Sequence, residues 1–213
     1  MALTELLTLA AKQMEQLRQH IPNTRFDIKE HAAFCEGVLS GRQFFCSVTS
    51  GSRSTPSRLH VGMDCFNPAS GNESLQLAAS VIHPIFVATA GEPRSLLARA
   101  FSLTSRVRTS DDEFDKVVQI RTAKPSPTEA FLAPQAHRAA IKELLEIGYG
   151  RVVHQGESVV ALRDNIETKL LDQQHLLLSS LEKLLELAHP VMIAKDSSVS
   201  VANSPHKNHF SMI

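Results

Sequence analysis

The chain has 213 residues, of which 43% are hydrophobic and 21% charged, a composition typical of a soluble globular domain with one substantial core. Its 22 lysines and arginines balance 22 aspartates and glutamates, so it lacks the net positive charge that attracts nucleic acid to a protein. It has no tryptophan and one tyrosine, which disfavours ligands that stack on such rings.

Both ends of the chain carry apolar residues at helical spacing. Residues 2–21 place apolar side chains three or four positions apart and precede Pro22, which predicts a long amphipathic helix. A second long helix is predicted over residues 165–189, with Asp164 as its cap and Pro190 after its end. The apolar stripe of this second helix consists of Leu170, Leu177, Leu181 and Leu184.

The region that follows the first helix is typical of β-structure. Over residues 25–66, short runs rich in Phe, Val and Cys alternate with turn residues such as Ser40-Gly41, which predicts antiparallel strands. Further short strands are expected at residues 75–79 and 85–88. Pro93 then suits the first turn of a short helix.

The region before the last helix mixes strands and helices. Residues 114–122 have a strand-like pattern. A helix is expected to begin at Ser126 through a capping box, to be interrupted at Pro134 and to end at Gly148. Residues 151–162 predict a β-hairpin.

These elements predict an α+β fold, with a mainly antiparallel sheet, packed helices, and long amphipathic helices at both ends. We expect residues 1–194 to form a single domain and residues 195–213, rich in Ser, Asn, Lys and His, to form a mobile tail. The first residues lack the basic start of a signal peptide, and no apolar run is long enough to span a membrane. A cytoplasmic location is therefore expected.

The three cysteines, Cys35, Cys46 and Cys65, form neither a CxxC pair nor an even disulfide set. If Ser40-Gly41 is a two-residue turn, Cys35 lies directly opposite Cys46 on neighbouring strands. We interpret these two residues as reduced, buried apolar side chains, with a redox pair as the alternative. A zinc site that adds Cys65 and His60 has no matching ligand spacing.

The sequence contains none of the common phosphate, dinucleotide, zincin or α/β-hydrolase signatures. We therefore expect no cofactor and no metal, and we assign no catalytic residue. The alternative is a small hydrolase or redox enzyme in which Cys35, Cys46 or Cys65 acts with a histidine. A thiol and an imidazole within about 3 to 4 Å in a deep pocket would favour that enzyme, whereas a closed core around the thiols would not.

About a quarter of the chain, residues 111–164, reads DDEFDKVVQIRTAKPSPTEAFLAPQAHRAAIKELLEIGYGRVVHQGESVVALRD. Through Phe114, Asp115, Leu132 and Pro134, this segment resembles a segment of bacterial proteins of unknown function. The resemblance implies a strand, two helices and a hairpin in one unit. It implies no activity, cofactor or binding residue.

The sequence has long amphipathic helices but no recognisable catalytic motif. This combination favours a non-enzymatic protein interaction or assembly module, whose partner is another protein or a second copy of the chain. The leucine stripe of residues 165–189 is the candidate partner face, because it is too broad to remain in water. Two interpretations stay open: the stripe packs inside the chain, or it pairs two copies. Neither a nucleic-acid partner nor a membrane span is expected.

Overall fold

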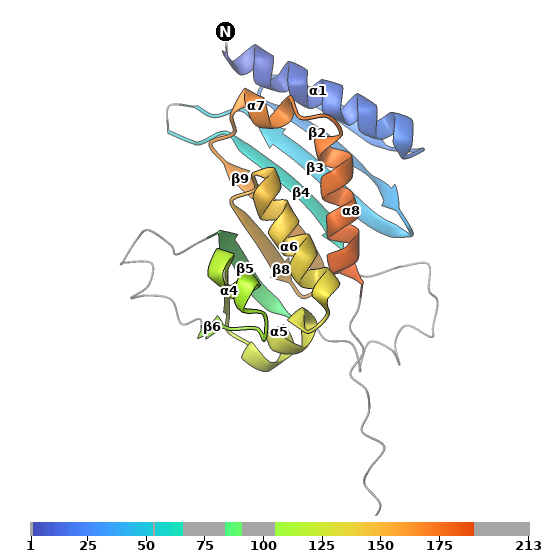
Figure 1. The fold of residues 1–213 in the computed structure, drawn as a ribbon. Helices are drawn as coiled ribbons and strands as arrows, with labels where there is room; N and C mark the ends of the chain where they lie inside the picture. Colours follow the sequence, from blue (N-terminus) through green and yellow to red (C-terminus); the bar gives the residue numbers. More distant parts are fainter. Residues whose placement is uncertain (1, 53, 66–83, 91–104, 190–213) are drawn as a thin grey trace, which may run out of the picture.

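The computed structural model describes residues 2–52, 54–65, 84–90 and 105–189 (Figure 1). Within this part of the chain, nine strands form one antiparallel sheet in the order β1-β2-β3-β4-β9-β8-β5-β7-β6. The fold is therefore α+β with an antiparallel sheet, as predicted. The strands are β1 (Arg25–Lys29), β2 (Ala32–Leu39), β3 (Arg42–Thr49), β4 (Arg58–Asp64), β5 (Ile85–Ala90), β6 (Ser105–Val107), β7 (Val118–Thr122), β8 (Arg151–Gln155) and β9 (Ser158–Asp164).

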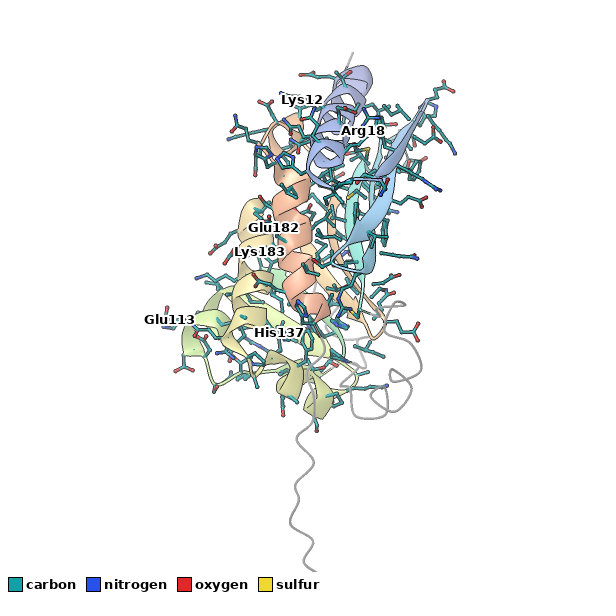
Figure 2. All side chains as sticks on the ribbon, turned by 90° about the vertical axis from the view of Figure 1, so that its right-hand side faces the viewer. Lys12, Arg18, Glu113, His137, Glu182 and Lys183 are labelled. Carbon is teal, nitrogen blue, oxygen red and sulfur yellow. The ribbon has the colours of Figure 1, made fainter. Side chains whose placement is uncertain are left out.

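The helices of the described residues lie on one face of the sheet (Figure 1), and the side view in Figure 2 shows α1, α6 and α8 on the same side of the strands. The core fills the space between the two layers, where inward-facing strand side chains such as Phe44 and Val48 are buried. No helix in the described ranges is long and apolar enough to cross a membrane. The helices are α1 (Ala2–His20), α4 (Asp112–Val117), α5 (Pro125–Leu132), α6 (Gln135–Ile147), α7 (Thr168–Leu171) and α8 (Leu176–Ala188).

Local turn and cap residues determine several of these elements as predicted. Ser40 and Gly41 both have positive φ angles, 53° and 79°, which is the geometry of a two-residue hairpin turn between β2 and β3. Gly148 ends α6 with a φ of 124°, a conformation that favours glycine. The predicted hairpin of residues 151–162 corresponds to β8 and β9.

The prediction of a strand over residues 114–122 was wrong at its start. Residues Asp112–Val117 form helix α4, and only Val118–Thr122 form strand β7. The helix begins there because the side chain of Asp111 accepts a hydrogen bond from the backbone N–H of Phe114 at 3.0 Å. The strand-like pattern of residues 114–122 led to the wrong prediction, because it takes no account of the N-cap at Asp111.

The predicted capping box at Ser126 does not form. Helix α5 starts at Pro125 instead, with Lys124 as a cap residue that makes no side-chain hydrogen bond. Pro125 fits the first helical position because it has no N–H to leave unpaired. The Thr128 hydroxyl, 2.8 Å from the carbonyl oxygen of Lys124, stabilises this first turn.

The predicted helix over residues 165–189 is interrupted. It splits into α7 and α8, and His175 adopts a left-handed conformation with a φ of 55° just before α8. The Nε2 group of Gln13 in α1 lies 3.0 Å from the Leu171 carbonyl oxygen and 2.6 Å from that of Gln173, so it satisfies carbonyls that the break releases. Asp164, the predicted cap, belongs instead to β9.

The predicted strand at residues 75–79, the predicted helix from Pro93 and the predicted tail at residues 195–213 lie outside the described residues.

Candidate functional site

Cys35 and Cys46 lie directly opposite each other in the β2–β3 ladder, as the turn count predicted. Both side chains are buried, and both cysteines are reduced. Burial raises the pKa of the Cys46 thiol well above its ordinary value, and the neighbouring Cys35 raises it further. A protonated, buried thiol is a weak nucleophile, which fits the role of a small apolar side chain. A redox role for the pair stays a prediction.

The structure does not bring together the zinc ligands that were considered. His60 pairs with Ser47 and Leu162, so its side chain lies on the sheet face opposite to that of Cys46. No group of three His, Cys, Asp or Glu side chains within the described ranges is arranged to hold a metal ion.

Cys65 and His154 form the one thiol and imidazole pair that the described residues show at hydrogen-bonding distance. The Sγ atom of Cys65 at the end of β4 lies 3.6 Å from Nε2 of His154 in β8. The two elements meet through β9, which pairs with both β4 and β8. This is the distance that a Cys/His enzyme would require.

The protonation of this pair opposes catalysis. The backbone N–H of Gly156, which also donates to the carbonyl of Pro84, lies 3.2 Å from Nδ1 of His154. Nδ1 is therefore an acceptor, and the proton of the neutral imidazole sits on Nε2, facing the sulfur. Burial raises the pKa of Cys65 to about 12, although the nearby Arg42 guanidinium opposes the shift. His154 then donates to a protonated thiol and has no free lone pair with which to remove its proton.

His154 instead belongs to a buried aromatic cluster. Its ring is only 2% exposed and packs edge-on against Phe131, with centroids 4.8 Å apart, and near Phe86 at 5.6 Å. The ring of His137 also packs against Phe131, with centroids 4.3 Å apart and an angle of 33° between the rings, and its Nδ1 donates to the Phe131 carbonyl oxygen at 2.7 Å. Burial lowers the pKa of His137, so it is neutral at neutral pH. These contacts join α5, α6, β5 and β8 and stabilise the fold.

The leucine stripe that was the candidate partner face packs inside the chain. Leu177, Leu181 and Leu184 of α8 are buried against the sheet and the neighbouring helices, and so is Leu170 of α7. A partner could not reach these side chains in this arrangement.

The sheet face opposite to the helices, called the open face below, carries no helix of the described chain (Figure 2). Strand register aligns its side chains in cross-strand rows, since directly paired residues share a face. One row consists of Arg25, Glu36, Phe45, Gly62, Val160, Val153, Val87, Arg121 and Arg106, and the next of Asp27, Phe34, Ser47, His60, Leu162, Arg151, Thr89 and Gln119.

Exposed apolar side chains concentrate on the open face. The described residues include seven large hydrophobic side chains that are exposed, and five of them lie on this face. They form two groups, one on the neighbouring strands β2 and β3 and one on β5, and they are Phe34, Val38, Phe45, Ile85 and Val87. Apolar surface gathered on one face of a folded chain is typical of a binding surface.

An open groove of about 450 Å³ crosses β1, β2 and β3 on this face. Phe34 and Phe45 stand beside it, and its rim carries two basic and two acidic side chains of β1 and β2: Arg25, Lys29, Asp27 and Glu36. The ring of Phe45 lies over Gly62, where an added Cβ atom would come within 2.4 Å of it. The missing side chain at Gly62 therefore leaves the space that the ring of Phe45 occupies above the sheet.

Sequence patterns did not indicate the open face, because strand alternation alone does not show which side of a sheet the helices cover. The available signal was the placement of Phe34, Val38 and Phe45 at positions that alternate with buried residues of β2 and β3. No family model, curated protein or solved structure matches the chain.

Proposed function

We propose that the protein is a non-enzymatic interaction or assembly module that binds a protein segment on the open face of its sheet. The observation that carries this proposal is the one-sided arrangement of the described helices, which leaves five large apolar side chains of the described strands exposed on the opposite face. Burying such side chains is worth about 25 cal/mol for each Å² of apolar surface removed from water.

The groove across β1–β3 fits a polypeptide better than a small metabolite. It combines two aromatic rings with charges of both signs on an exposed surface, whereas small-molecule sites are enclosed and hold a few convergent polar groups. The ring of Phe45 lies over Gly62, which has no side chain to keep a partner from the ring. Aromatic anchors with a polar rim are typical of protein interfaces.

Phe34 offers a test with a matched control. It lines the groove and is 40% exposed on the open face, and Val117, at the end of α4 and away from that face, is 45% exposed. Phe34→Glu should abolish binding of a partner, since it would bury a charge in the interface, whereas Val117→Glu should leave binding intact. Partners captured by the wild-type protein from native cells would be identified, purified and titrated against both variants by calorimetry.

Two outcomes would contradict the proposal. Equal affinity of a purified partner for the wild-type protein and Phe34→Glu would exclude the groove on the open face as its binding surface. Equal loss of affinity in both variants would attribute the effect to general damage, which thermal unfolding of each variant would measure directly.

A second candidate function rests on the 3.6 Å separation of Cys65 and His154. It is a hydrolase or redox enzyme in which the Cys65 thiolate attacks a carbonyl or disulfide. Turnover of a model thioester that Cys65→Ser abolishes without unfolding the chain would support it. The raised pKa of Cys65 and the Nε2 proton of His154 favour the interaction module instead.

A further inference from the structure

Strand β1 forms one edge of the sheet and pairs only with β2 among the described strands. The two strands are joined by a two-residue turn, so the closing pair Lys29 and Ala32 is hydrogen-bonded, and so is every second pair beyond it. The backbone N–H and C=O groups of Phe26 and Ile28 therefore point away from the sheet. No described residue makes a hydrogen bond to them.

The apolar side chain of Ile28 is open at this edge. It is 47% exposed although it lies on the same face as the helices, next to Ala33 of β2. Phe26, two residues earlier, is half-buried beneath the guanidinium of Arg18 in α1, 5.6 Å from its ring centroid. The edge thus presents free backbone groups and an uncovered apolar side chain at the same residue, Ile28.

The charges that flank Ile28 match a second copy of the same strand. Within one chain, Nζ of Lys29 lies 3.5 Å from Oδ2 of Asp27 on the open face, and both side chains are about two-thirds exposed. We propose that two copies of the chain pair edge to edge through antiparallel β1 strands, with the twofold axis at Ile28. Ile28 then faces Ile28 of the second copy, and Asp27 faces Lys29 of the second copy on both sides of the axis.

This register gives partners to three kinds of group at the strand edge. The two Ile28 residues exchange two backbone hydrogen bonds, their side chains cover each other, and two oppositely charged pairs form directly across the strands. The axis is perpendicular to the sheet, so the two sheets continue into one and both helical layers lie on the same side.

Neighbouring registers are disfavoured by like charges. An axis at Asp27 sets Asp27 against its own copy and Arg25 against Lys29, which is the usual way in which charges protect an edge strand. An axis at Phe26 pairs Asp27 with Arg25 of the second copy, but it sets the exposed Ile28 against Thr24 and turns the two Arg18 guanidinium groups, which lie over the Phe26 rings, toward each other. The register at Ile28 is therefore the one that both pairs opposite charges and covers Ile28 with its own copy.

This interface goes beyond the proposed function, because it uses the strand edge and does not depend on what the open face binds. Size exclusion coupled to light scattering of the full chain should give about twice the 23.4 kDa chain mass for the wild-type protein. Asp27→Lys sets lysines against each other and Lys29→Asp sets aspartates against each other, so each should raise the dissociation constant at least roughly tenfold. The double charge swap restores opposite charges and should restore the dimer.

The double swap also restores the ion pair that Asp27 and Lys29 form within one chain, so the two single variants are mixed as well. In that mixture only residues 27 and 29 of different copies carry opposite charges, and dimers that contain one copy of each variant should form. Circular dichroism should show that all variants remain folded, since both side chains are exposed. A wild-type monomer at all accessible concentrations would overturn the proposal. A dimer that neither single variant weakens, or that the double variant fails to restore, would overturn it equally.

Discussion

Alkylation of Cys65 by iodoacetamide should be roughly 1,000-fold slower in the folded protein than in the chain unfolded in urea. The thiolate is the reacting species, and the pKa of Cys65 rises from the ordinary 9.0 to about 12 on folding. Three pKa units lower the thiolate fraction about 1,000-fold at any pH below 9. Quenched time points with peptide mass spectrometry report the rate of each cysteine separately, so no substitution is required.

The same experiment tests the assignment of Cys65 and His154 as structural residues. Cys46, whose pKa burial also raises, provides an internal reference for a protected thiol. If folded Cys65 reacted as fast as the unfolded chain, or faster, its thiolate would be stabilised by the native structure. That result would refute the reasoning and favour the enzyme over the interaction module.

Three further predictions concern stability, each measured by urea unfolding. Ser180→Ala should cost about 1–3 kcal/mol and more than Tyr149→Phe, because it leaves the buried Tyr149 hydroxyl without its 2.9 Å acceptor, and the double variant should cost less than the sum. Folding lowers the pKa of His137 below its ordinary value of 6.5, so the unfolded chain binds the proton more tightly and the free energy of unfolding falls as the pH drops below 6.5. His137→Asn keeps a donor for the Phe131 carbonyl oxygen but cannot titrate, so it should flatten this dependence of stability on pH. Leu181→Asp should unfold the chain, since Leu181 is completely buried and the charge would cost several kcal/mol; a folded variant of wild-type stability would contradict the assignment of the leucine stripe to the core.

Features set by neighbouring residues were predictable from the sequence. The Ser40-Gly41 turn determines the register that sets Cys35 against Cys46, because counting outward from a two-residue turn fixes every pair. The end of α6 at Gly148 follows from one residue that tolerates a positive φ.

Features set by distant contacts were not predictable in this way. The break between α7 and α8 depends on Gln13, which is 158 residues away from the carbonyl of Leu171. The open face likewise depends on which side of the sheet the helices occupy, and the approach of Cys65 to His154 depends on β9 lying between β4 and β8. Propensity and periodicity carry no information on such packing.

The order of the strands has a consequence for how the chain is made. The β8–β9 hairpin, residues 151–164, lies in the middle of the sheet, between β4 and β5, although it is among the last elements in the chain. A nascent chain therefore has two separate strand groups, with the edges of β4 and β5 unpaired, until this hairpin has emerged from the ribosome. Closing the sheet requires contacts between residues about 100 positions apart, such as Val61 and Ala161, and such distant pairings make folding slow. Completion of the fold is thus a late event that follows synthesis of most of the polypeptide.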